Sequence, residues 1–80
     1  MMPENTEEIK KSDELQKLKS LATDFDMASK LRIQAIDRLG EMDNHEALLV
    51  LLELAANDKL SIDERDFALK RAREIVKKGR

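Results

Sequence analysis

The longest apolar stretch of the chain is ALLVLLELAA, residues 47–56, in which Glu53 is the single charged residue. Ten residues are too many for an ordinary strand and too few to cross a bilayer. On a helix they would leave almost no polar direction, so this helix must be covered on nearly all sides. We therefore expect residues 44–56 to form the most buried helix of the fold.

Elsewhere, apolar residues recur at helical spacing between short polar links. Ser61 and Glu64 form a capping box, and Asn5 and Asp43 each precede a Glu by three residues, as residues at helix starts do. No segment shows the alternation and turns of a hairpin strand. The pattern predicts an all-α chain with helices at 13–23, 28–42, 44–56 and 62–78, and a frayed or separate helical turn at 6–11.

A shift of 33 residues aligns the chain with itself, with eight identities in the 29 pairs from 15/48 to 43/76. The identical pairs are Leu15/Leu48, Leu18/Leu51, Leu21/Leu54, Ala22/Ala55, Arg32/Arg65, Ala35/Ala68, Arg38/Arg71 and Glu41/Glu74. Short links make neighbouring helices antiparallel. We predict one domain over residues 1–80, with an N-terminal arm at 1–12 and two helical-hairpin repeats at 13–43 and 44–80.

The segment LRIQAIDRLGEMDNHEALLVLLELAAND resembles a short HEAT-type repeat, the variety also found in phycobilin lyases. The residues that carry the resemblance are Arg32, Ala35, Leu39-Gly40, Asp43-Asn44 and Ala47-Leu48. The second repeat departs from the pattern, with Ala72 in place of Leu and Arg73 in place of Gly. The resemblance implies a right-handed stack of two antiparallel hairpins in a HEAT-like α–α superhelix, a fold that hosts many functions.

The two repeats differ on one face of their first helices. Leu15, Leu18 and Leu21 predict an inward stripe, and their counterparts Leu48, Leu51 and Leu54 predict the central core. The polar residues Gln16, Lys17 and Lys19 of the first repeat become Leu49, Val50 and Leu52 in the second. Two stacked repeats do not bury such a surface fully, so we expect it to meet either the N-terminal residues, with Ile9, or a second chain.

Composition narrows the possible classes of protein. The chain has no cysteine, which excludes disulfides and thiolate metal ligands. The polar start MMPENTEEIKK is not a secretory signal, and no apolar run approaches 18 residues, so we expect a cytoplasmic protein that does not contact membranes. The net charge of −2 combines +4 over residues 64–80 with −6 over residues 1–63.

Arg32 and Arg65 each lie within an apolar stripe, where a charge needs a partner. The neighbouring turns offer Asp24 or Asp26 to Arg32, and Asp58 to Arg65. We interpret both arginines as structural ties that brace the turns, and an anion-binding role stays as the alternative.

Catalytic and metal-binding patterns are missing from the sequence. His45 is the single histidine, and a metal would need three or four convergent ligands. No nucleophile–base pair and no Gly-rich phosphate loop is visible. We therefore expect no enzyme activity, no metal and no cofactor.

The sequence favours a small protein–protein interaction module that binds through the outward residues of its second helices. These residues are Gln34, Asp37, Arg38, Glu41, Phe67, Lys70, Arg71 and Glu74. A homodimer through residues 44–56 is also open. The alternative is a nucleic-acid accessory protein that uses Lys70, Arg73 and Lys77, which share one side of the last helix. It is less favoured because the chain has few aromatic residues for base stacking.

Overall fold

The computed structural model describes the backbone of residues 6–78 and the side chains of residues 13–78. This part of the chain consists of four helices without strands, which confirms the all-α prediction. The helices are α1 (Thr6–Ala22), α2 (Ser29–Met42), α3 (His45–Ala55) and α4 (Ile62–Lys78). The later three lie within one residue of their predicted bounds.

The N-terminal prediction is wrong in one respect. The helix that was predicted to begin at residue 13 begins at Thr6 and runs unbroken to Ala22, so the helical turn predicted at 6–11 is part of it. Its sequence contains no Gly or Pro, so nothing in it interrupts a helix that has begun. The predicted cap Asn5 lies outside the described residues.

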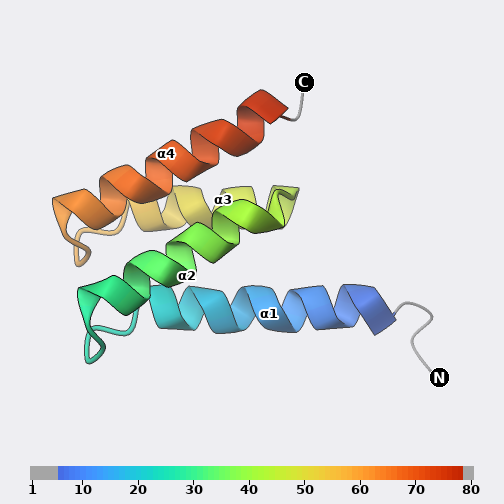
Figure 1. The fold of residues 1–80 in the computed structure, drawn as a ribbon, viewed down its shortest axis with the longest axis horizontal. Coiled ribbons are helices and arrows are strands. Elements are labelled where there is room, and N and C mark those ends of the chain that lie inside the picture. The colour runs from blue at the N-terminus through green and yellow to red at the C-terminus, as the bar shows by residue number, and fades with distance from the viewer. Residues whose placement is uncertain (1–5, 79–80) are drawn as a thin grey trace.

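The four helices form two antiparallel hairpins, α1 with α2 and α3 with α4, which we name the first and the second hairpin (Figure 1). Helices α2 and α4 lie side by side in one layer, and α1 and α3 lie behind them. Helix α2 contacts all three other helices, whereas the described parts of α1 and α4 do not touch. The result is a flat body whose Cα atoms extend 43 × 34 × 17 Å.

The turns inside the two hairpins have the same hydrogen bonds, 33 residues apart. In the first turn, Asp24 accepts the Asp26 amide at its Oδ1 (3.0 Å) and the Met27 amide at its carbonyl (3.1 Å). In the second turn, Asn57 accepts the amides two and three residues later in the same way, at 2.9 and 3.1 Å. An Asx side chain closes such a turn locally, so the repeat in sequence extends to the backbone of these two turns.

The helix starts follow the capping rules, with one shift in position. Asn44 caps α3, accepting the Ala47 amide at 2.7 Å, so the prediction that Asp43 caps this helix is wrong. Asp43 instead ends α2 in the left-handed conformation, with φ of 52°. The predicted capping box of α4 is confirmed, since Ser61 Oγ accepts the Glu64 amide at 3.1 Å and Glu64 Oε1 accepts the Ser61 amide at 2.9 Å.

The core lies between the two layers and draws on every helix. Its buried residues are Leu15, Leu18, Ala22, Ala35, Ile36, Leu39, Ala47, Val50, Leu51, Leu54, Leu60, Ala68, Ala72 and Ile75. As predicted, α3 is richer in buried residues than α2 or α4, with four of its 11 residues buried. Two predictions about core leucines are wrong, because Leu48 is only half-buried and Leu21 is exposed.

The second apolar surface of α3 is only partly covered. Val50 is buried by the chain itself, whereas Leu49 and Leu52 are 47% and 43% exposed. The proposed lid with Ile9 falls on residues whose side chains lie outside the described part. Within the described part, Leu49 and Leu52 therefore remain on the surface.

Candidate functional site

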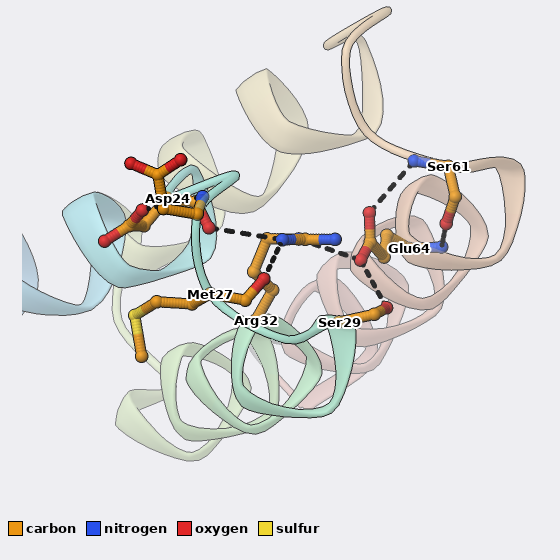
Figure 2. Close-up of polar contacts among 7 residues, drawn as sticks. Asp24, Met27, Ser29, Arg32, Ser61 and Glu64 are labelled. Atoms are coloured by element: carbon orange, nitrogen blue, oxygen red, sulfur yellow. Dashed lines mark hydrogen bonds and ion pairs between the residues drawn. The ribbon is translucent and has the colours of Figure 1, made fainter.

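The two hairpins are joined by an ion pair between the starts of α2 and α4 (Figure 2). Arg32 Nε donates to Glu64 Oε2 at 2.9 Å, and Ser29 Oγ donates to the same oxygen at 2.5 Å. Arg32 Nη1 also donates to the backbone carbonyls of Asp24 (3.2 Å) and Met27 (2.6 Å). One guanidinium thus holds the turn of its own hairpin and the helix start of the next.

This pair is removed from water. The Glu64 side chain is 1% exposed and that of Arg32 is 13% exposed. Burial raises the pKa of Glu64, but hydrogen bonds from Ser29, the Ser61 amide and Arg32, together with the arginine charge, lower it more, so the pKa lies below its usual 4.5. Glu64 is therefore an ionised carboxylate, and its two oxygens are already occupied by protein donors.

The predicted partners of Arg32 were incorrect. Asp24 contributes its carbonyl and not its carboxylate, which closes its own turn. Asp26 is exposed, and it is the Asp26 amide that takes part in that turn. The carboxylate on Arg32 comes from Glu64, whose capping box uses only Oε1. The capping box was visible in the sequence, and because it uses only one oxygen of Glu64, it indicated that the second oxygen could bind another donor.

Arg65 occupies the equivalent position in the second hairpin, but its surroundings differ. Its Nη1 lies 3.9 Å from Asp58 Oδ1, so the predicted pair is present, although it is long and its carboxylate is 99% exposed. The Nε of Arg65 is buried and has no hydrogen-bond partner among the described residues. Arg65 thus lacks the close carboxylate that Arg32 has.

A second tie joins α2 and α4. Arg71 Nη2 donates to the Asp37 carbonyl at 3.3 Å, its Nη1 donates to Glu74 at 2.7 Å, and its Nε lies 3.5 Å from Asp37 Oδ1. The guanidinium lies against Gly40, where an added Cβ would overlap it. Asp37, Arg71 and Glu74 were predicted to contact a partner protein, and they are instead engaged with one another inside the chain.

The remaining residues of that predicted surface are scattered. Gln34, Arg38, Glu41 and Lys70 are exposed, and Arg38 Nη2 donates to Glu14 Oε2 at 3.2 Å. Phe67 is half-buried against the core, so it is a packing residue and not an exposed anchor. The outer surface of α2 and α4 offers no continuous apolar patch at these positions.

A continuous apolar surface lies instead in a groove of about 550 Å³ between α3 and α4, which Lys70 and Glu74 of the predicted surface also line. Leu48 and Leu52 of α3 face Leu69 and Val76 of α4 across this α3–α4 groove. Lys70, Arg73 and Lys77 also line it, so the structure brings together the three predicted nucleic-acid contacts. Val76 and Leu52 are 52% and 43% exposed.

A smaller hollow of about 200 Å³ adjoins the groove, since Leu69 lines both. Arg65 and Asp66 line this Arg65 hollow together with Ala55 and Ile62. All residues that line the groove and the hollow belong to the second hairpin. The combined site has aliphatic walls, three cations and Glu74 along one side, and Arg65 and Asp66 near one end.

Among the described residues, no group of three or more His, Cys, Asp or Glu side chains could hold a metal ion. His45 lies exposed at the start of α3. None of the described helices has the length and hydropathy needed to span a membrane.

In comparisons with known proteins, no family, no curated protein and no solved structure matches this chain. The contacts of the site itself therefore define its character. What these define is an all-α domain of two hairpins with an apolar, basic-edged groove at one end.

Proposed function

We propose that the protein is a small, non-enzymatic interaction module of HEAT-like hairpins, which binds another protein in the α3–α4 groove. The observation that carries this proposal is the exposure of large aliphatic side chains along one groove, with Leu52 and Val76 about half exposed. Contiguous apolar surface of this kind on a soluble domain marks association sites. The binding surface shares Lys70 and Glu74 with the one that the sequence favoured, but its apolar part lies elsewhere, because the outer residues of α2 are polar.

The arrangement of the hairpins supports the HEAT-like part of the proposal. Equivalent helices lie in the same layer, and equivalent turns share their hydrogen bonds. In stacked-repeat proteins each unit packs on its neighbours, and a terminal unit needs a polar outer face. Helix α1 carries exposed Gln16 and Lys17 on its outer side, as a terminal unit does. The second hairpin ends in the apolar groove, which is the surface an adjacent unit or partner would cover.

Nucleic-acid binding is the second candidate, because Lys70, Arg73 and Lys77 line one groove. Single-stranded nucleic acids bind through base stacking on aromatic rings as well as through cations. The walls of this groove are aliphatic, and Phe67 packs against the core. The groove therefore suits an apolar side chain better than a base.

The test is capture of partners from lysate of the native host with three tagged proteins: wild type, Leu52→Glu and Gln34→Glu. Leu52 lines the groove, whereas Gln34 is an exposed control on α2. We expect a protein that wild type and Gln34→Glu both retain and that Leu52→Glu loses, while circular dichroism shows equal helicity. Retention of the same partner by all three proteins would contradict the groove as the binding site. Capture of nucleic acid instead of a protein would support the second candidate.

A further inference from the structure

We propose that the α3–α4 groove and the Arg65 hollow accept an acidic amphipathic helix from another protein, and that a carboxylate of this helix pairs with Arg65 as Glu64 pairs with Arg32. The inference rests on the proposed function and adds the chemistry of the partner. Its basis is that the chain already contains one example of the contact, between its own two hairpins.

The first hairpin holds the second through a small set of residues. Four of them form a hydrogen bond or an ion pair with Glu53, Glu64 or Arg71, and the fifth, Gly40, lies against the Arg71 guanidinium. The five residues are Lys19, Ser29, Arg32, Asp37 and Gly40. Moving each by the repeat length of 33 gives Leu52, Ile62, Arg65, Lys70 and Arg73. Every one of these five residues lines the groove or the hollow. The second hairpin therefore presents outward the same positions that the first uses to hold its neighbour.

The unmatched donor at this face is Arg65. In the first hairpin, the equivalent Nε donates to a buried carboxylate at 2.9 Å. In the second hairpin, the Arg65 Nε is buried without an acceptor, and the nearest carboxylate, that of Asp58, stands 3.9 Å from a different nitrogen. A buried guanidinium donor is best satisfied by a carboxylate. Ile62, 66% exposed beside it, supplies apolar surface for the same ligand.

The charges that line this face are mostly positive and favour an acidic ligand. Arg65, Lys70, Arg73 and Lys77 outnumber the two acidic residues, Asp66 and Glu74, and Glu74 is already bonded to Arg71. Where the first hairpin presents Asp37 to Arg71, the second presents Lys70, and where the first has Gly40, the second has Arg73. Lys77 extends the same positive edge. A partner that fits must therefore carry a carboxylate at the position that Arg71 of α4 occupies in its contact with α2. A helix with an apolar stripe flanked by Glu or Asp has this distribution.

A second copy of this chain does not have this distribution of apolar and acidic residues. A copy that stacked in register would bring Leu31 to the place of Glu64 and Arg38 to the place of Arg71. Leu31 cannot accept a hydrogen bond from Arg65. Arg38 would lie against the cations Lys70 and Arg73, and repulsion between like charges disfavours this contact. Helix α1 of the same chain contacts α2 and α3 but not α4 within the described residues. The ligand is therefore a helix of a different protein.

The probe is an 18-residue labelled peptide based on residues 61–78, with Lys70, Arg71, Arg73, Lys77 and Lys78 replaced by Glu. A matched peptide carries Glu64→Gln in addition, and the unmodified basic sequence is the third probe. Binding to the full chain is measured by fluorescence anisotropy. We expect the acidic peptide to bind the wild type, and the peptide change Glu64→Gln to weaken binding by about tenfold or more. The protein variant Arg65→Gln should lower affinity for the acidic peptide equally and should make the two peptides indistinguishable.

Arg38→Gln, which removes an exposed arginine of α2, is the control and should leave affinity unchanged. Thermal unfolding of Arg65→Gln shows that the variant is folded. Independent, additive effects of Glu64→Gln and Arg65→Gln would overturn the pairing. Preference for the basic peptide or for a single-stranded oligonucleotide, or no peptide binding at about 1 mM, would overturn the acidic-helix assignment. Loss of host partners from Leu52→Glu would still uphold the proposed function in those cases.

Discussion

Arg32 and Arg65 occupy equivalent sequence positions but differ in what surrounds them. The Arg32 side chain is 13% exposed and bonds to a carboxylate that is 1% exposed. The Arg65 side chain is 32% exposed, and the carboxylate with which it pairs, that of Asp58, is 99% exposed. The two arginines therefore form a natural matched pair for measuring what a buried ion pair contributes.

Replacing Arg32 by Ala should destabilise the fold far more than replacing Arg65. Arg32→Ala leaves the Glu64 carboxylate buried without its cation, and breaking a buried pair in this way costs about 3–5 kcal/mol. Arg65→Ala removes a long, solvent-exposed contact, and the expected loss is about 1 kcal/mol or less. Urea unfolding of both variants measures the difference. Equal losses would mean that the Arg32–Glu64 pair contributes no more than a surface contact.

The lowered pKa of Glu64 predicts a dependence of stability on acidity. A carboxylate with a lower pKa in the folded state stabilises it fully above the unfolded value of 4.5, and this contribution is lost as pH falls through the folded pKa. Urea midpoints of wild type and Glu64→Gln should therefore differ by a constant amount above pH 4.5 and converge below it. Glu41→Gln, at an exposed position, is the control. A gap between wild type and Glu64→Gln that persists at low pH would contradict the assignment.

At the scale of the helices, the sequence predicted what depends on local chemistry. The capping box of α4 is confirmed because Ser61 and Glu64 satisfy amides within one turn, whatever surrounds them. The choice between Asp43 and Asn44 was missed because both can cap, and the left-handed residue that ends α2 decides between them. The partner of Arg32 was missed for a different reason. Glu64 is 32 residues away, so only the packing of the hairpins brings them together.

Exposure was also harder to predict than helix position. Leu21 and Leu54 are equivalent in the repeat, yet Leu21 is 40% exposed and Leu54 is 2% exposed. Helix α3 lies between its own partner α4 and the first hairpin, whereas α1 has neighbours on fewer sides. The same apolar pattern is therefore buried in one helix and left on the surface in the other. The groove was missed for the same reason, since its walls come from two helices.

At the scale of the whole molecule, we expect a monomer. The groove would bring Lys70, Arg73 and Lys77 of two copies together if it were a symmetric dimer interface, and their charges repel. Light scattering should give a mass near the 9.2 kDa of one chain, for wild type and for Leu52→Glu alike. A wild-type dimer that Leu52→Glu converts to a monomer would instead support the homodimer through α3.

The position of Glu64 has a consequence for how the chain folds. Stacked-repeat proteins often behave as a row of weakly coupled units that open independently from the ends. Here Glu64 closes the first turn of α4 with one oxygen and binds Arg32 of α2 with the other. One side chain therefore closes the start of α4 and also joins the two hairpins. Such shared use of one side chain favours a single cooperative unit, in which the Ser61 and Glu64 amides exchange their protons only when the whole domain unfolds.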